Sequence, residues 1–474
     1  MTRSRRRGGK DTGYHGQASM VSSIVNLLNT IIGAGTLAMP SVLSHMGIML
    51  GVILIIWSGM TAAFGLYLQT KCARYLERGT SSFFALSQIT YPSAAVIFDM
   101  AIAIKCFGVG VSYMIIIGDL MPGVVLGFNS HADRLPYLVD RAFWITAFML
   151  LVIPLSFLRR LDSLKYTSLV ALVSIGYLII LVIYHFATDA HANPRDIRVI
   201  KWEGAVATLS TVPVVVFAYT CHQNMFSIMN EIKDNRPSSM MGVIGTSIGS
   251  AASIYILVSI TGYLTFGNSV VGNIVSMYPT GAASTIGKAA IVVLWRPSGG
   301  QASGRANSPA PPPRSDHASA PMSDTRFALL TTLILTFAYI TALTVDSLDR
   351  MLAFVGSTGS TSISFILPGL FYYKISDPDS IHHQRLLKED DDMGDSADED
   401  IEDSANLAQS TGSIRSAASN SSGREGWRWR RKWRWDLEHL EHGLIRRMAL
   451  ALAIYGMVVM AVCLIMNIFF AATG

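Results

Sequence analysis

The stretch from Asn26 to Pro40, NLLNTIIGAGTLAMP, combines residue types that suit a binding site. It lies inside an apolar run from Met20 to about Leu50, yet it contains two Asn, a Gly-Ala-Gly-Thr tetrad and a Pro, which weaken or unwind a helix. A helix broken at membrane depth leaves N–H and C=O groups without partners, and these are tolerated only where they line a cavity or contact a ligand. The stretch is therefore a candidate binding site.

A second polar segment interrupts a later apolar run. Thr211-Val-Pro213 precedes FAYTCHQN, residues 217–224, in which hydroxyl, thiol, imidazole and amide groups follow one another. Paired interrupted helices in corresponding positions of two halves are the best sequence indication of a substrate site at the membrane midplane. The two polar segments are the natural candidates for such a pair.

Four ionisable side chains also fall inside apolar runs, namely Asp99, Lys105, Asp119 and His222. Such groups are costly within a membrane unless they are paired or face water, so function is the first hypothesis for each. Alternatives remain: the two Asp residues could lie at opposite interfaces, and Lys105 could extend its stem to the headgroups. His222, with an unperturbed pKa near ~6.5, suits a proton-driven step, but a hydrogen-bonded structural histidine is the favoured alternative.

The composition indicates the class of protein. Of the 474 residues 51% are hydrophobic and only 15% are charged, and the mean hydropathy is +0.40. These values and the recurring uncharged runs are typical of a polytopic all-α membrane protein. The four cysteines stand singly and without metal-ligand spacing, so neither a disulfide framework nor a metal site is expected.

The apolar runs predict about eleven membrane-spanning helices. They lie at about 20–43, 47–70, 94–126, 142–158, 164–187, 204–230, 240–266, 282–295, 327–345, 351–373 and 447–471. Basic residues gather on one side of these spans, as cytosolic loops do: Arg3, Arg5, Arg6, Arg7, Lys10, Lys71, Arg74, Arg78, Arg159, Arg160 and Lys165. We therefore expect a basic cytosolic tail at 1–18 and a carboxyl terminus on the lumenal side.

Five spans in each half would form an inverted repeat, with one further helix at the end. An odd number of spans per half forces the two halves into opposite orientations in the membrane. The first and sixth spans then correspond, and they are the two that carry the polar interruptions. This arrangement is the sequence pattern of a transporter with a midplane site.

Four segments together resemble the amino acid/auxin permease family, most closely its fungal vacuolar amino-acid transporters. They are NTIIGAGTLAMP, FDMAIAIKCFGVGVSYMIIIGDLMP, FAYTCHQNMFSIMNE and LAFVGSTGSTSISFILPGLFYY. The resemblance implies a LeuT-like bundle of eleven helices, proton-linked amino-acid transport and residence in the vacuolar membrane. The Lys105 ammonium could then occupy the place of a sodium ion in sodium-driven relatives, or titrate as the coupling group; Asp99 and His222 are the other coupling candidates.

An amino acid presents a carboxylate and an ammonium, which suit the positive end of one helix and the negative end of another. We expect the N–H groups around Gly33 to Thr36 to bind the carboxylate, with the Tyr113 hydroxyl, and carbonyls of the sixth span to bind the ammonium. The full candidate set is Asn29, Gly33, Ala34, Gly35, Thr36, Tyr113, Phe217, Ala218, Tyr219 and Thr220. The alternative for Gly33 and Gly35 is close helix packing.

The eighth span departs from the family pattern. Residues 282–295 give roughly 21 Å of helix against ~30 Å of hydrocarbon. A Pro/Gly/Ser/Ala-rich segment follows at 296–326, within the core assigned to 19–375, and it cannot form a spanning helix. Either the eighth helix is defective or the segment is mistranslated, as from a retained intron, and the chain could then be inactive.

The segment from 376 to 446 is expected to be a disordered cytosolic loop before the final helix at 447–474. Lys388 to Asp403 is strongly acidic, and Ser404 to Gly423 is rich in Ser and Ala. The run WRWRRKWRW at 427–435 combines Trp with Arg, which suits a membrane surface and no nucleic-acid site.

These features together predict a secondary active transporter of amino acids, coupled to protons, that works by alternating access within a lipid bilayer. No cofactor motif is visible, and no nucleophile, base and orienting group recur at a spacing that would indicate an enzyme. The alternative from another class is an amino-acid sensor with little flux. The side chain of the substrate does not follow from the sequence.

Overall fold

The computed structural model describes residues 16–129, 131–157, 164–189, 196–294, 324–385 and 421–473. Within these ranges regular structure is helical, apart from one isolated bridge between Ala18 and Ile232. Residues 1–15 of the expected basic tail lie outside the described part of the chain.

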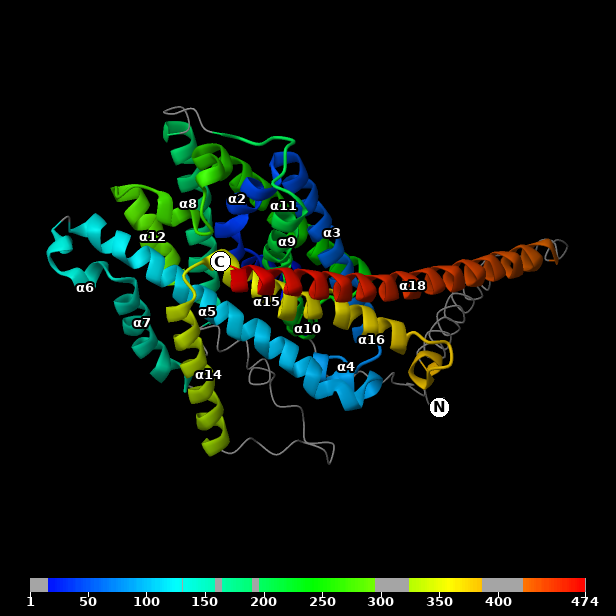
Figure 1. The fold of residues 1–474 in the computed structure, drawn as a ribbon. Coiled ribbons are helices and arrows are strands. Elements are labelled where there is room, and N and C mark those ends of the chain that lie inside the picture. The colour runs from blue at the N-terminus through cyan, green and yellow to red at the C-terminus, as the bar shows by residue number, and fades with distance from the viewer. Residues whose placement is uncertain are drawn as a thin grey trace, which may run out of the picture.

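The helices of the first half follow the predicted order (Figure 1). They are α1 (Met20–Ile31), α2 (Ala34–Met46), α3 (Ile48–Ala73), α4 (Phe83–Thr90), α5 (Ala95–Phe128), α6 (Pro136–Val139), α7 (Arg141–Ser156) and α8 (Leu164–Asp189). The second part contains α9 (Ala205–Tyr219), α10 (His222–Glu231), α11 (Pro237–Phe266), α12 (Ala282–Leu294), α14 (Asp324–Thr344), α15 (Leu348–Val355), the π-helices η5 (Gly356–Ser360) and η6 (Ser362–Ile366), α16 (Leu367–Ile375) and α18 (Ser421–Thr473).

Seven helices in the described residues are long and apolar enough to cross a membrane, and the bent pair of α1 and α2 makes an eighth candidate. Three shorter apolar helices, at Arg141–Pro154, Val173–Thr188 and Ala282–Val292, correspond to the predicted fourth, fifth and eighth spans. Each predicted span thus has a helical counterpart. The count of eleven stays a prediction, because the apolar stretches found for these three spans are shorter than a membrane crossing requires, although α8 as a whole has 26 residues.

The broken helices lie at the centre of the bundle. α2 packs against both α9 and α11, and α1 packs against α10 and α11. α5 packs on α7, α12, α14 and α15 around this centre. The outer face of α3 is apolar and open, with Ile53, Ile56, Trp57 and Met60 each between 46% and 62% exposed. Large apolar side chains on an outer surface are suited to contact with lipid.

A glycine defines the sharp turn between α2 and α3. Gly47 has a φ of 75°, and a Cβ at this position would lie 2.7 Å from the carbonyl oxygen of Lys201. Side-chain-bearing residues rarely adopt this φ, and the close carbonyl leaves no room for one. The turn therefore returns the chain directly from the first predicted span into the second.

The late span from Leu348 to Ile375 is α-helical at its ends and π-helical between Gly356 and Ile366. The wider π-turn coincides with the sequence GSTGSTSISFI, which places small and hydroxyl-bearing residues inside the span. Such insertions are frequent at functional sites. This feature was not expected from the sequence, which indicated an ordinary helix.

The last helix begins earlier than the predicted boundary at 447. α18 is one helix of 53 residues from Ser421 to Thr473, and it extends well beyond the other helices (Figure 1). The backbone of the 427–435 segment is therefore helical, whereas the sequence suggested a loop up to 446. The acidic segment at 388–403 and the interruption at 296–323 lie outside the described residues.

Two glycines on α5 provide a matched test of this packing. A methyl group added at Gly108 would collide with Val355 of α15, whereas nothing lies within 4 Å of the same position at Gly110. We expect Gly108→Ala to destabilise the protein by about 1–3 kcal/mol, because overpacking forces the two helices apart. Thermal unfolding of the purified variants measures this. An equal loss of stability in Gly110→Ala would contradict the predicted contact between α5 and α15.

Candidate functional site

The predicted break in the first span is present. α1 ends at Ile31, α2 begins at Ala34, and the two helices are bent by 53°. Gly33 precedes α2 and supplies no side-chain cap. The Thr36 N–H donates to the Gly33 carbonyl at 3.0 Å, but the N–H groups of Ala34 and Gly35 have no partner among the described residues. A positive helix end with two open N–H groups suits a carboxylate.

The second predicted break lies between α9 and α10. Thr220 has a ψ of 101°, outside the helical region, and α10 begins at His222. The bend is milder than in the first span, because Ala205–Glu231 still qualifies as one continuous candidate span. The Thr220 N–H closes a tight final turn on the Phe217 carbonyl at 3.1 Å. The helical hydrogen bonding stops here, so the carbonyl end of α9 is a negative helix terminus.

The two breaks lie side by side. A Cβ on Gly35 would lie 2.5 Å from the Cβ of Ala218, so the backbones of α2 and α9 approach closely. The Asn224 amide donates to the Thr30 hydroxyl at 2.7 Å, which joins α10 to α1. The positive end of α2 and the negative end of α9 are thus held next to each other. Gly35 is accounted for by packing, which was the alternative considered for it.

Tyr255 on α11 joins the two breaks, and sequence reasoning did not identify it. Its hydroxyl lies 2.7 Å from the Ile31 carbonyl and 2.8 Å from the Ala218 carbonyl, and its side chain is fully buried. A hydroxyl carries one proton, so it donates to one of these carbonyls at a time. The only signal in the sequence is a tyrosine within the apolar run of α11, and that pattern alone names no partner.

Lys105 lies at the carbonyl end of α9. Its ammonium donates to the Phe217 carbonyl at 3.4 Å and lies 3.4 Å from the centre of the Phe217 ring. The side chain is 2% exposed, so the ammonium points into the bundle and not toward the interface. No carboxylate in the described part of the chain forms an ion pair with it. A cation is stabilised here by the helix end and by the aromatic face.

The carbonyls expected to bind an ammonium differ in their present partners. Phe217 accepts from Lys105, and Ala218 accepts from Tyr255. The Tyr219 carbonyl follows at the helix end without such a side-chain donor among the described residues. A carbonyl has two acceptor positions, so a substrate ammonium could bind beside these donors or replace them.

Tyr113 of α5 lies beside the break in the first span. Its hydroxyl is 3.1 Å from the position that a Cβ on Gly33 would occupy, so α5 contacts the break in the first span directly. A larger residue at position 33 would crowd this hydroxyl. The Tyr113 hydroxyl therefore lies beside the break at which the N–H groups of Ala34 and Gly35 are unpaired.

The remaining candidates lie close to the two breaks. Asn29 is half-buried on α1, and Thr36 is fully buried in the first turn of α2. The Thr220 hydroxyl donates to the Val216 carbonyl at 2.7 Å and accepts from Ser364 at 3.2 Å. The Ser364 contact connects the second break to the π-helix η6. The π-helical segment thus contacts the second break.

The geometry of His222 favours the structural alternative. Its Nε2 lies 3.1 Å from the Ala62 carbonyl of α3, and the residue is fully buried. Its Nδ1 has no hydrogen-bond partner among the described residues. A neutral ring that donates from Nε2 explains this contact without a proton-transfer role.

The two aspartates of α5 lie away from the breaks. Asp99 is exposed near the beginning of the helix. Asp119 pairs with Arg141 at 3.2 Å, and Arg141 also reaches Asp346 at 3.3 Å and the Val345 carbonyl at 2.9 Å. This network joins α5 to α7 and to the segment before α15. The described residues contain no group of three potential metal ligands.

A protein-family comparison agrees with this arrangement. The model described as "Transmembrane amino acid transporter protein" matches residues 16–295 and 312–391. The chain belongs to this transmembrane amino acid transporter family. The match omits residues 296–311, which fall within the segment that the sequence analysis identified as foreign to the family pattern.

Two similar proteins carry vacuolar transporter names. "Vacuolar amino acid transporter 5" of Schizosaccharomyces pombe is 44% identical over 365 residues, which cover 76% of this chain and 86% of that protein. "Vacuolar amino acid transporter 6" of Saccharomyces cerevisiae is 39% identical over 414 residues, which cover 76% of this chain and 90% of that protein. The resemblance inferred from the motifs is confirmed. So is the expectation that the chain is not an enzyme, because its relatives are named as transporters.

A solved structure agrees in fold. The crystal structure of MhsT in complex with L-phenylalanine aligns over 94% of this chain and 99% of MhsT, with a TM-score of 0.50 and 12% identity. At this identity the likeness concerns the fold alone. It confirms the expected fold class, an all-α polytopic membrane protein with a LeuT-like fold.

The Tyr255→Phe variant tests whether the Tyr255 hydroxyl holds the two helix breaks together. We expect a loss of about 1–3 kcal/mol in the free energy of unfolding, because a buried carbonyl loses its donor. The control is Tyr184→Phe on α8, whose side chain is half-exposed and makes no described hydrogen bond through its hydroxyl. Chemical or thermal unfolding in detergent measures both variants. Equal stability of Tyr255→Phe and the unaltered protein would contradict the bridging role.

Proposed function

We propose that this chain transports amino acids across the vacuolar membrane by alternating access, driven by protons. Its amino terminus faces the cytosol and its carboxyl terminus the lumen. Family membership and the names of its fungal relatives support the substrate class and the location. The clustered basic loops support the orientation.

One observation carries the proposal most directly: the positive end of α2 and the negative end of α9 meet at two adjacent helix breaks. The open N–H groups of Ala34 and Gly35, with the Tyr113 hydroxyl, bind the substrate carboxylate. The carbonyls of Phe217 to Tyr219 bind the ammonium. The site recognises the carboxylate and the ammonium that all amino acids share. Selection among amino acids depends on contacts of the substrate side chain elsewhere.

Lys105 is the coupling group in this proposal. Its ammonium already occupies the carbonyl end of α9, where a substrate ammonium is also expected to bind. Deprotonation removes one of the two competing cations, so proton release and substrate binding depend on each other. His222 and Asp99 are the weaker candidates, because one bonds the α3 backbone and the other is exposed away from the breaks.

Flux in reconstituted vesicles tests the function. We expect the purified full-length chain to accumulate radiolabelled amino acids from a panel when a pH gradient is imposed, and to lose accumulation when an ionophore collapses the gradient. Accumulation that persists without the gradient would contradict proton coupling.

Two other outcomes distinguish the alternatives. Binding of an amino acid without flux would identify a sensor. Neither binding nor flux would indicate an inactive chain, in agreement with the family match that omits 296–311. Sequencing the transcript across codons 290–326 shows whether that segment is a retained intron.

Lys105→Gln tests the coupling group. We expect this variant to exchange amino acids across the membrane but to lose pH-driven accumulation, because a neutral amide cannot carry the proton. His222→Gln is the matched comparison, and its pH dependence should equal that of the unaltered chain. Counterflow and pH-jump uptake in the same vesicles measure both activities. A Lys105→Gln variant with unchanged pH dependence would exclude Lys105 as the coupling group.

A further inference from the structure

The segment at 196–203, called the strap below, lies across the turn between α2 and α3. The Ile48 N–H donates to the Arg198 carbonyl at 3.1 Å, and the Met49 N–H donates to the Val199 carbonyl at 3.0 Å. These N–H groups belong to the first turn of α3, whose N-cap residue supplies no side-chain hydrogen bond. The strap therefore caps the start of α3 with its own carbonyls.

The same segment binds the end of α2. The Glu203 N–H donates to the His45 carbonyl at 3.0 Å, and the Arg198 guanidinium donates to the Ser44 carbonyl at 3.2 Å. Both carbonyls lie in the last turn of α2, where a helix has acceptors without intrahelical donors. The other end of α2 carries the open N–H groups of the first break. The strap thus fixes the far end of the half-helix that is expected to bind the substrate carboxylate.

The strap also joins this end of α2 to α11. The fully buried Tyr263 of α11 accepts from the Arg198 N–H at 2.8 Å and donates to the Asn268 side chain at 2.7 Å. Asn268 in turn donates to Asp196 at 3.0 Å, which returns the chain of hydrogen bonds to the strap. α11 therefore contacts the broken first span at two levels, at the break through Tyr255 and at the end of α2 through the strap.

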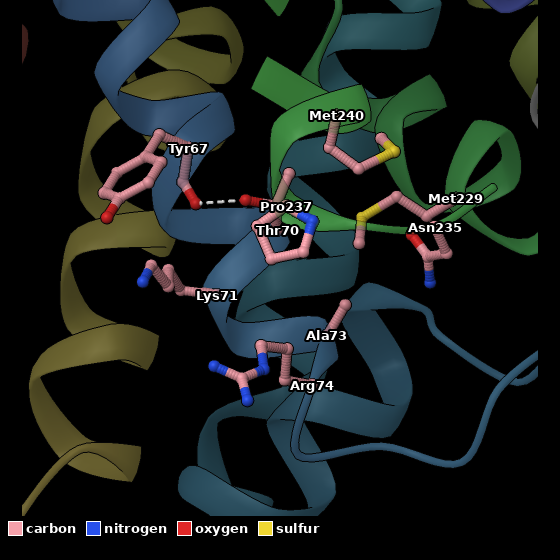
Figure 2. A pocket seen from close by; sticks show the side chains of 9 residues that line it. All are labelled: Tyr67, Thr70, Lys71, Ala73, Arg74, Met229, Asn235, Pro237 and Met240. Atoms are coloured by element: carbon pink, nitrogen blue, oxygen red, sulfur yellow. Dashed lines mark hydrogen bonds between the residues drawn. The ribbon is translucent and has the colours of Figure 1, made fainter. Parts of the chain in front are cut away.

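The opposite ends of α3 and α11 are arranged differently. A cavity of about 100 Å³ lies between them and the end of α10 (Figure 2). The hydrogen bond drawn among its lining residues, from the Thr70 hydroxyl to the Tyr67 carbonyl at 2.7 Å, stays within α3 (Figure 2). The strap, in contrast, forms hydrogen bonds to both α3 and α11.

One side-chain pair of this assembly changes its charge near neutral pH. The His45 Nδ1 atom lies 2.5 Å from the Glu203 Oε2 atom, and the two side chains are 42% and 43% exposed. An imidazole takes up a proton between about pH 8 and pH 5, whereas a glutamate carboxylate is ionised over most of this range. A charge-assisted hydrogen bond is stronger than a neutral one. Acid therefore strengthens the contact between α2 and the strap.

Other charged groups act on this pair. Arg198 lies 3.7 Å from the other carboxylate oxygen of Glu203 and partly opposes a charge on His45. Asp349 of α15 attracts a charged His45. α9 and α11, which also pack on α2, carry no charged residue. The remaining charged residues of the strap and of the helices packed on α2 are Asp196, Lys201, Lys71 of α3, Asp99, Lys105 and Asp119 of α5, and Arg350 of α15.

We propose that the strap is a pH-sensitive clamp on the lumenal end of α2, which holds that helix more firmly when the lumenal side is acidic. Protonation of His45 adds an ion pair with Glu203 to the backbone hydrogen bonds, and it places a positive charge at the negative end of α2. Deprotonation removes both effects. This side is the lumen in the orientation of the proposed function, on which the inference rests. Lumenal acidity then stabilises the position of the half-helix that offers its N–H groups to the substrate.

Hydrogen–deuterium exchange of the purified full-length chain measures the clamp. Peptides that cover 44–52 and 196–205 contain the amides of Ile48, Met49 and Glu203, and their protection is taken relative to the intrinsic exchange rate at each pH. We expect this protection to fall roughly two- to fivefold from about pH 5 to about pH 8, because an exposed ion pair contributes modestly. His45→Gln and Glu203→Gln keep a hydrogen-bonding side chain but should lose most of this pH dependence.

The matched control is His131→Gln, because His131 is exposed in the loop before α6 and forms no ion pair with the described residues. This variant should keep the pH dependence of the unaltered chain. An unchanged pH dependence in His45→Gln, or an equal loss in His131→Gln, would overturn the proposal. So would a fall in protection that extends equally to peptides of α5, because it would show general destabilisation. The measurement needs no flux, so a failure of the clamp is distinguishable from a failure of transport.

Discussion

The structure depends on one constraint: peptide groups at membrane depth must have partners. A continuous helix satisfies its own N–H and C=O groups, whereas the breaks at Gly33 and Thr220 do not. The fold meets this cost by placing the two breaks side by side, so that groups at one break contact groups at the other. The close contact of Gly35 with Ala218 and the hydroxyl of Tyr255 are the means by which this is done. The unpaired N–H groups at the start of α2 and the carbonyls at the end of α9 remain, and they carry opposite partial charges.

The surrounding helices have distinct roles around this pair. α11 supplies Tyr255 and connects both breaks, while α5 brings the Tyr113 hydroxyl to one break and the Lys105 ammonium to the other. The π-helical segment adds Ser364, which donates to Thr220. Motion of any of these helices therefore changes the partners of the broken segments. The alternating-access mechanism proposed above requires such a link between helix movement and ligand binding.

The sequence predicts the breaks because their cause is local. Each break falls inside a segment whose residue types oppose helix formation, but it is confined to a few residues, because Asn26, Asn29 and Pro40 lie within α1 and α2 and α10 begins at His222. Tyr255 and Ser364 could not be predicted as site residues, because their roles arise from contacts between segments distant in the chain. For the same reason the sequence does not distinguish Gly33 from Gly35. The structure places Gly33 beside the Tyr113 hydroxyl and Gly35 against Ala218 of α9. The early start of α18 at Ser421 was missed because its first turns lack an apolar periodicity.

The central claim is that an amino acid binds with its carboxylate at α2 and its ammonium at α9. The most direct measurement is a cryo-electron microscopy structure of the full-length chain in lipid nanodiscs with an amino acid that thermal-shift screening identifies as a ligand. The account predicts carboxylate oxygens within hydrogen-bond distance of the Ala34 and Gly35 amides, and an ammonium at the Phe217 to Tyr219 carbonyls. A ligand bound at any other place in the bundle, or first and sixth spans that run as unbroken helices, would contradict it.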